Sequence, residues 1–320
     1  MEKMLIVSSS PHAKAKHTTR SIMLDVIIAL IPALIASIYF YGLRALLLTV
    51  VSVVSCVGFE WLWEKIFKRM ITIQDLSAVV TGVLIAYNVP ANAPVFIVVV
   101  GAFVAIILAK QVFGGIGQNF INPALAARAF LLAGYSTAMR SFKIATPGEL
   151  FSGVDAVTGA TPLELMKNSL IDQLPSLGDV FIGNIGGCIG EASVLALLIG
   201  VIYLLFKKVI TWHIPVCYIG TVFVLTFLLN GFNAYMSFYS LCLGGLLLGA
   251  CFMATDYTTT PMTIKGQIIF AMGAGLLTTL IRLYGGYPEG VSYSILLMNL
   301  VVPLIDKYVK KRRFGEGEKA

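Results

Sequence analysis

Long apolar runs that carry almost no charge recur along this chain and constrain its fold more than any other feature. The runs approach the length of about 20 residues at which a helix crosses the hydrocarbon core of a bilayer. Backbone polar groups find no water in lipid, so each run is predicted to be a helix. Of the 320 residues, 58% are hydrophobic and 12% are charged, which leaves little chain for a soluble domain. We predict an all-α polytopic membrane protein, with residues 1–320 forming one membrane domain.

Nine runs are clear from hydropathy, and a tenth is shorter. The nine are 21–40, 46–61, 76–89, 95–108, 184–206, 212–229, 238–254, 267–281 and 291–304. Basic residues are concentrated in 1–20 and 305–320, which places both tails in the cytoplasm by the positive-inside rule. Two cytoplasmic ends require an even number of crossings, so the short run 122–134 is predicted to be the tenth helix. The segment 135–183 is then an extracytoplasmic loop.

The charge balance and the spacing of the cysteines and histidines bear on two classes of function, nucleic-acid binding and metal binding. The 23 Lys and Arg against 16 Asp and Glu give a net charge of +7, but the basic residues lie in short connections and at both ends. This pattern indicates membrane topology rather than nucleic-acid binding. The five cysteines lack CxxC spacing and the three histidines are dispersed, so we predict no metal site.

The loop contains the sequence DAVTGATPLELM at 155–166. Thr161, Pro162 and Glu164 have the spacing of a helix N-cap, a proline at the first helical position and a capping-box glutamate. One interpretation is therefore a short, well-capped helix that runs toward Leu170.

The same turn would also suit a phosphate group on Thr161, because a helix N-terminus offers free amide donors and a positive dipole end. The small residues Gly159 and Ala160 leave space for a bulky partner to approach. Spacing alone leaves the capped helix and the modified threonine open as alternatives.

Two stretches interrupt the helical pattern, GGIGQNFINP at 114–123 and the segment 258–263, which contains Pro261 and belongs to the sequence TDYTTTPMT. Each is either a turn between helices or irregular backbone that lines a cavity, as in many transporters. Asn119 and Asn122 are the candidate ligand- or ion-binding residues of the first stretch. Since both stretches follow a helix on the cytoplasmic side of opposite halves, we predict two inverted halves of five helices each.

Acidic side chains inside a span are costly in lipid and mark candidate ion pathways. Asp25 lies five positions into the first predicted span, and Glu191 lies eight positions into the span 184–206. Each is a candidate for the ion path, and hydration at the membrane interface is the alternative. Asp256 and Arg282 lie at span ends, where we expect interfacial anchors.

Several stretches resemble one family of membrane subunits. VTGAT at 157–161 resembles a flavinylation motif whose core is Ser/Thr-Gly-Ala-Thr, and MATDYTTTPMTIKG at 253–266 resembles a family segment that usually has proline where Tyr257 stands. Similar stretches are found at 75–94, 110–130 and 289–306. The family includes the D subunit of the Rnf ion-translocating oxidoreductase complex and, more distantly, the B subunit of the sodium-pumping NADH:quinone reductase.

The resemblance implies that a flavin transferase attaches FMN to the Thr161 hydroxyl through a phosphodiester, with Asp155, Thr158, Gly159 and Ala160 completing the motif. A second, non-covalent flavin such as riboflavin is a further expectation. The resemblance also implies a urea-transporter-like fold and a location in the bacterial inner (plasma) membrane.

The implied activity is that of one subunit of a translocase. Electrons would pass between partner subunits of a ferredoxin:NAD oxidoreductase, coupled to movement of Na⁺ or H⁺. No GxGxxG motif is present for a nicotinamide, so no complete active site is expected on this chain alone. The implied partners are the other Rnf-type subunits, the flavin transferase and membrane lipid.

The alternative function is a flavin-free channel or secondary transporter for a small solute. Apolar helices, interruptions and inverted halves would fit that function equally well. VTGAT at 157–161 distinguishes the two, because a transporter has no need of a flavinylation motif.

Overall fold

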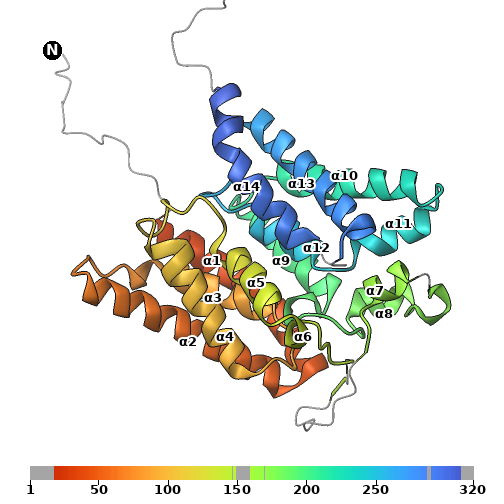
Figure 1. Ribbon diagram of the computed structural model, residues 1–320, viewed down its shortest axis with the longest axis horizontal. Coiled ribbons are helices and arrows are strands. Elements are labelled where there is room, and N and C mark those ends of the chain that lie inside the picture. The colour runs from red at the N-terminus through yellow and green to blue at the C-terminus, as the bar shows by residue number, and fades with distance from the viewer. Residues whose placement is uncertain (1–17, 146, 149–158, 169, 287–289, 311–320) are drawn as a thin grey trace, which may run out of the picture.

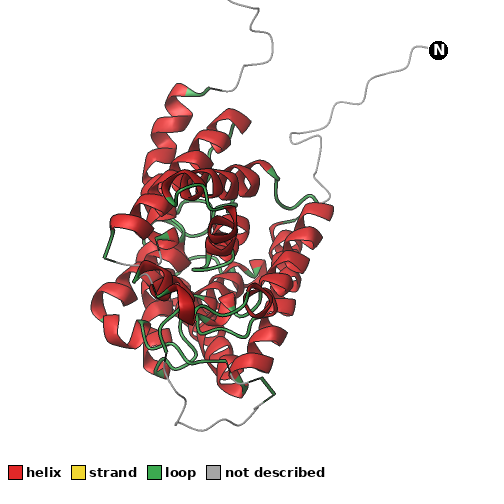
Figure 2. Ribbon diagram, turned by 90° about the vertical axis from the view of Figure 1, so that its right-hand side faces the viewer, coloured by secondary structure: helices red, strands yellow, loops and turns green. Residues whose placement is uncertain are grey.

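The computed structural model describes residues 18–145, 147–148, 159–168, 170–286 and 290–310. Within these ranges the regular structure is helical and no strand forms, which confirms the prediction of an all-α chain (Figure 2). One isolated β-bridge pairs Pro90 with Cys188.

An N-terminal bundle is formed by the first part of the chain, red to yellow in Figure 1. Its elements are α1 (Thr19–Tyr41), α2 (Leu43–Ile66), the 3₁₀ turn η1 (Ile73–Asp75), α3 (Ser77–Tyr87), α4 (Val95–Phe103), the π-helix η2 (Val104–Gln111) and α5 (Pro123–Gly134). A capping box of Thr18 and Ser21 starts α1. Gly42, with φ 77°, makes the turn from α1 into α2.

Short elements connect this bundle to the rest. They are α6 (Ser136–Met139), α7 (Pro162–Lys167), η3 (Ile171–Gln173), α8 (Leu177–Ile182) and η4 (Ile189–Glu191). Figure 1 places α7 and α8 together, at the opposite end of the molecule from the end of the last helix.

The C-terminal bundle follows, green to blue in Figure 1. Its elements are α9 (Val194–Phe206), α10 (His213–Leu229), α11 (Ala234–Leu241), α12 (Leu246–Leu248), the π-helix η5 (Gly249–Met253), α13 (Ile264–Tyr284) and α14 (Val291–Tyr308).

Four of the described helices are long and apolar enough to cross a membrane, namely α1, α2, α13 and α14. The pair 234–241 and 246–253, bent by 62°, makes a fifth if it is one span. Shorter apolar helices occupy the other predicted runs. Large apolar side chains such as Ile35, Val54 and Ile202 remain exposed on the outer surface, which suits contact with lipid.

Close backbone approach holds the helices together. α2 packs on α3 and α4, α10 packs on α11 and α13, and α1 packs on α9 across the two bundles. A Cβ added at Gly82 would lie 2.7 Å from the Val53 Cα, and one at Gly200 would lie 2.1 Å from the Ala29 carbonyl oxygen. Small residues at such crossings are the usual means of packing helices in a membrane.

Two predicted spans differ from the observed helices. The run 238–254 is broken between α11 and α12, because Gly244 and Gly245 adopt left-handed φ values of 63° and 65°. The run 184–206 becomes helical only at Val194, where the Ser193 side chain accepts a hydrogen bond from the Ala196 N–H.

Glu191 therefore lies in the 3₁₀ turn η4 and not within a membrane helix, so its predicted position eight residues into a span is wrong. Gly183, with φ 119°, ends α8, and the glycine-rich stretch up to Gly190 does not continue as a helix. Hydropathy alone does not detect these glycines.

Candidate functional site

The two predicted interruptions meet in space although they are far apart in the sequence. The Asn119 Nδ2 donates to the Thr258 Oγ1 at 3.0 Å, and the Asn122 Nδ2 donates to the Met253 carbonyl at 3.3 Å. The structure thus brings the two candidate asparagines of the N-terminal bundle against the second interruption.

Each interruption follows a π-helix, η2 in one bundle and η5 in the other. π-Helical turns are rare in proteins overall, and those that occur are often found at functional sites. After η2, Gly114 and Gly115 take φ values of 122° and 97°. After η5, the Asp256 carboxylate accepts hydrogen bonds from the Thr258 N–H at 3.4 Å and the Thr258 Oγ1 at 2.9 Å, which holds the second loop in a tight turn.

Asn122 also begins the next helix. Its Oδ1 accepts hydrogen bonds from the Ala124 N–H at 3.0 Å and the Leu125 N–H at 3.3 Å, and Pro123 occupies the first turn of α5. Asn122 is thus fixed on both sides, as the N-cap of α5 and by its contact with Met253 at the end of η5.

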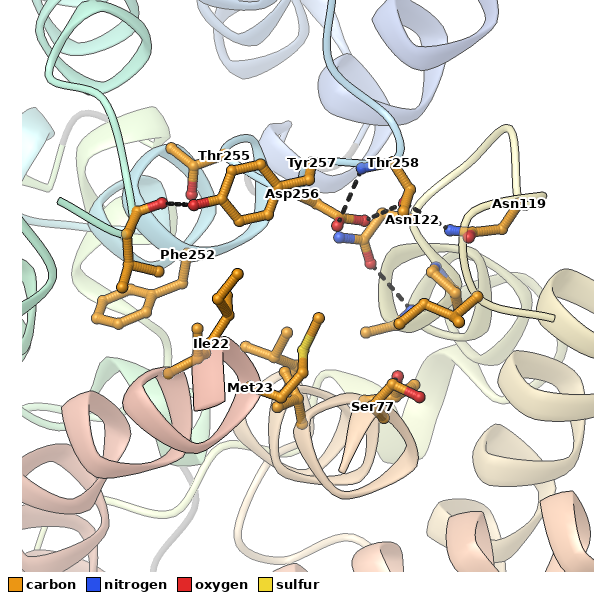
Figure 3. A pocket seen from close by; sticks show the side chains of 18 of the residues that line it. Ile22, Met23, Ser77, Asn119, Asn122, Phe252, Thr255, Asp256, Tyr257 and Thr258 are labelled. Atoms are coloured by element: carbon orange, nitrogen blue, oxygen red, sulfur yellow. Dashed lines mark hydrogen bonds between the residues drawn. The ribbon is translucent and has the colours of Figure 1, made fainter. Parts of the chain in front are cut away.

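A pocket lies where the loops meet, and we call it the two-loop pocket (Figure 3). Its polar lining residues include Ser77, Lys110, Asn119, Asn122, Asp256 and Thr258. Its apolar lining includes Ile22, Met23, Val80, Leu84, Leu204 and Phe252. In Figure 3, Ile22, Met23 and Ser77 face the Asp256–Thr258 loop across the opening. Apolar walls with a few convergent polar groups are typical of small-molecule sites.

Tyr257, which replaces the proline usual in the similar family segment, has a structural contact of its own. Its hydroxyl donates to the Val209 carbonyl, and Val209 also lines the two-loop pocket. Burial raises the pKa of the Tyr257 hydroxyl. The side chain joins the second loop to the connection between α9 and α10.

The N-cap predicted at Thr161 is confirmed. The Thr161 Oγ1 accepts a hydrogen bond from the Glu164 N–H at 3.3 Å, and Pro162 is the first residue of α7. The helix ends at Lys167 rather than near Leu170, with Asn168 as its C-cap. The Thr161 side chain is 5% exposed.

Of the other motif residues, Gly159 and Ala160 are described, whereas Asp155 and Thr158 lie outside the described residues. The Gly159 N–H donates to the Phe142 carbonyl at 3.2 Å. A Cβ added at Gly159 would lie 3.0 Å from the Ile144 Cδ1, so this glycine permits close packing on the 142–144 segment. Ala160 is exposed.

A second cavity, of about 170 Å³, lies beside α7, and we call it the α7 cavity. Its lining includes Lys167, Asn230, Ser240, Thr279 and Arg282, together with Leu163 and Met166. Arg282 is 7% exposed, and its Nη1 and Nη2 donate to the Ser240 and Leu243 carbonyls at 2.9 and 2.8 Å. Arg282 is therefore buried against the break between α11 and α12, and the expectation of an interfacial anchor is wrong.

The candidate ion-path residues have different surroundings. The Asp25 Oδ1 accepts a hydrogen bond from the Tyr203 hydroxyl at 2.8 Å and lies 4.0 Å from the Lys207 Nζ. The Glu191 Oε1 lies 4.0 Å from the Arg128 Nη1, with both side chains nearly buried. Neither acid lines the two-loop pocket.

One buried ion pair was not singled out from the sequence. The Lys110 Nζ donates to the Glu60 Oε1 at 2.7 Å, with exposures of 3% and 0%. Glu60 is the next-to-last residue of the predicted span 46–61, but α2 continues to Ile66 and buries it. Lys110 lies two residues beyond the predicted span 95–108, but the helix continues through η2 to Gln111 and buries it.

Helices of membrane-spanning length, glycine-mediated packing and two interrupted segments that meet at a pocket define this chain as a polytopic helical membrane protein with an internal pocket between its two bundles. The chain matches the NQR2, RnfD, RnfE family over residues 6–315 and belongs to that family.

Similar proteins cover nearly the whole chain. The D subunit of the Na⁺-translocating ferredoxin:NAD⁺ oxidoreductase complex of Acetobacterium woodii is 53% identical, over 98% of this chain and 96% of the relative. The D subunit of the proton-translocating ferredoxin:NAD⁺ oxidoreductase complex of Clostridium ljungdahlii is 44% identical, over 98% and 97%. The D subunit of the ion-translocating oxidoreductase complex of Shewanella amazonensis is 36% identical, over 97% of each.

Proposed function

We propose that this chain is a membrane subunit of an ion-translocating ferredoxin:NAD⁺ oxidoreductase complex in the bacterial inner membrane, where it passes electrons between partner subunits. The observation that carries the proposal is the similarity to subunits of that name over nearly the full length of both chains. These two relatives are named for different ions, so either Na⁺ or H⁺ is compatible with the proposal.

The covalent cofactor we propose is FMN on Thr161, attached by a flavin transferase. A flavin exchanges one or two electrons, while the protein binds it and tunes its surroundings. The Thr161 Oγ1 accepts the capping hydrogen bond from the Glu164 N–H through one lone pair. Its hydroxyl proton takes no part in this cap, so the phosphoryl group of FMN can replace it. Thr161 is 5% exposed, so its hydroxyl must become accessible for FMN to be attached, either before the surrounding residues pack around it or when they move apart.

The α7 cavity fits a phosphate-bearing ligand near Thr161. Lys167 and Arg282 provide positive charge, and Asn230, Ser240 and Thr279 provide hydrogen-bonding groups. No acidic residue is among the cavity's lining in the described chain. We infer that these side chains hold the attached FMN.

For the two-loop pocket we propose a second, non-covalent flavin such as riboflavin. Apolar walls suit a planar ring, and Asn119 and Asn122 provide amide groups at the edge of the pocket. Asp25 and Glu191 remain candidates for the ion path.

We further propose ten membrane crossings in two inverted halves, with both ends cytoplasmic. In the N-terminal bundle α2 packs on α3 and α4, in the C-terminal bundle α10 packs on α11 and α13, and in both bundles a π-helix precedes an interrupted segment. The opposite positions of α7 and the end of α14 in Figure 1 agree with an extracytoplasmic motif and a cytoplasmic C-terminus.

The decisive experiment is mass spectrometry of the peptide that contains Thr161, from protein produced together with its flavin transferase. We expect added mass that corresponds to FMN, and a fluorescent band on a denaturing gel that Thr161→Ala abolishes. Thr158→Ser, which preserves the Ser/Thr-Gly-Ala-Thr core, is the matched control and keeps the label on Thr161. An unmodified wild-type peptide would contradict the proposal and favour the flavin-free transporter.

A further inference from the structure

The ion pair of Glu60 and Lys110 lies in the wall of the two-loop pocket. Lys110 is in the π-helix η2 and lines the pocket, as does Ser77, whereas Glu60 is on α2 behind them. The Lys110 Nζ donates to the Glu60 Oε1 at 2.7 Å and to the Ser77 Oγ at 2.6 Å. Charge from two helices is thus concentrated on one side of the pocket.

Lys110 is held from several directions. The Ser77 Oγ that accepts its hydrogen bond donates in turn to the Asp75 Oδ1 at 2.6 Å. The Gln111 Nε2 donates to the same Glu60 oxygen at 2.8 Å. The ammonium group is therefore fixed in position before any ligand arrives, which lowers the entropic cost of binding.

The hydrogen bonding of the pair is incomplete. An ammonium group has three donors, and Glu60 and Ser77 accept two of them. In the described chain no third acceptor contacts the Lys110 Nζ, and the Glu60 Oε2 has no hydrogen-bond partner. A buried ion pair seldom improves stability over an apolar replacement, so an incompletely satisfied one in a pocket wall points to a role in binding.

We propose that Lys110 binds the carbonyl edge of the flavin in the two-loop pocket and that Glu60 is its positioning residue. The inference rests on the proposed second flavin. The pyrimidine edge of a flavin carries carbonyl oxygens that accept hydrogen bonds, and a cation beside this edge tunes the flavin's electronic properties. The pocket's apolar residues then contact the ring faces, and Lys110 selects which edge points toward η2.

The test is a titration of the full-length chain with riboflavin, followed by fluorescence quenching. The protein is produced without the flavin transferase, so that Thr161 carries no FMN. The key variant is Glu60→Gln/Lys110→Met, which removes both charges and leaves no unpaired buried charge. Loss of a charge-assisted hydrogen bond is expected to raise the Kd for riboflavin about 10- to 100-fold.

Three further variants distinguish a role of Glu60 in positioning Lys110 from a role of the pair in helix packing. Lys110→Arg keeps the cation and is expected to bind more tightly than the double variant. Glu60→Gln alone releases Lys110 and is expected to give an intermediate Kd. Glu64→Gln is the matched control: Glu64 lies on the same helix with 2% exposure, contacts Thr72, does not line the pocket, and its variant should bind like the wild type.

The midpoint potential of the bound riboflavin provides a readout that a purely structural pair would not change. Reduction adds negative charge to the flavin, so loss of the cation should weaken binding of the reduced form more and lower the potential. A tenfold greater loss for the reduced form corresponds to a shift of about 30 mV for a two-electron couple.

An unchanged Kd and potential in the double variant would overturn the role of Lys110. A wild-type chain that shows no saturable riboflavin binding would overturn both the flavin of this pocket and the inference that depends on it. Binding by the wild type with loss in the double variant, but not in Glu64→Gln, supports the proposal.

Discussion

The helices of the two bundles are joined by different chemistry. In the N-terminal bundle, Glu60 and Lys110 form an ion pair between α2 and η2. In the C-terminal bundle, hydroxyls link α10, α13 and α14, with the Tyr218 hydroxyl 2.6 Å from the Thr278 Oγ1 and 2.9 Å from the Ser294 Oγ. Because neutral hydroxyls hold one set of helices, packing does not require charge, which supports a binding role for the ion pair.

The largest expected effect comes from breaking the ion pair on one side only. Lys110→Met leaves Glu60 buried without its partner, which should lower the free energy of unfolding by about 3–5 kcal/mol. Chemical denaturation in detergent measures this loss. The double variant Glu60→Gln/Lys110→Met should recover most of it, and equal losses in both variants would show that burial of a lone charge is not the cause.

A smaller effect is expected where the two bundles touch. Gly200→Ala places a methyl group against the Ala29 carbonyl, so we expect a loss of about 1–3 kcal/mol from overpacking. Gly220→Ala on α10 is the control, since no atom lies within 4 Å of the added Cβ, and a gain of up to about 1 kcal/mol is expected from helix propensity. Equal unfolding free energies for the two variants would contradict the close contact of α1 with α9.

The hydroxyl cluster of Tyr218, Thr278 and Ser294 should contribute less to the free energy of unfolding than the ion pair of Glu60 and Lys110. Tyr218→Phe removes the shared hydroxyl and is expected to cost about 0.6–1.7 kcal/mol, the range for hydrogen bonds between membrane helices. Tyr235→Phe, at a tyrosine with 55% exposure on α11, should leave stability unchanged. A loss from Tyr218→Phe as large as that from Lys110→Met would remove the distinction between the bundles.

The contact between the two loops should give the smallest effect. A double-mutant cycle of Asn119→Ala and Thr258→Val tests the 3.0 Å hydrogen bond, and we expect a coupling energy of about 0.5–1 kcal/mol. If the losses of unfolding free energy in the two single variants simply add up in the double variant, the two loops are not joined by this hydrogen bond.

Hydropathy predicted the helices well where apolar runs are continuous. The runs that begin at 21 and 291 correspond to α1 and α14, and the Thr161 cap followed from local spacing. The break at Gly244 and Gly245 was missed, because a hydropathy average treats glycine as neutral and does not register a left-handed backbone.

The site was only partly accessible from the sequence. Asn119 and Asn122 were singled out because glycines and a proline surround them. Their contact with Thr258 and Met253 joins residues more than 100 positions apart, which no local pattern encodes. The Glu60–Lys110 pair was missed for the same reason, because its two members lie 50 positions apart in the sequence.

The contact of Gly200 with Ala29 limits how the molecule can move. Because there is no room for even one methyl group between Gly200 and Ala29, α1 and α9 cannot approach each other more closely. Separating the two helices would expose backbone that is now covered. A rearrangement of one bundle against the other that kept this contact would turn about the crossing of α1 and α9. The two-loop pocket, whose wall includes Ile22 of α1 and Leu204 of α9, lies beside that axis, where a small rotation would change its width.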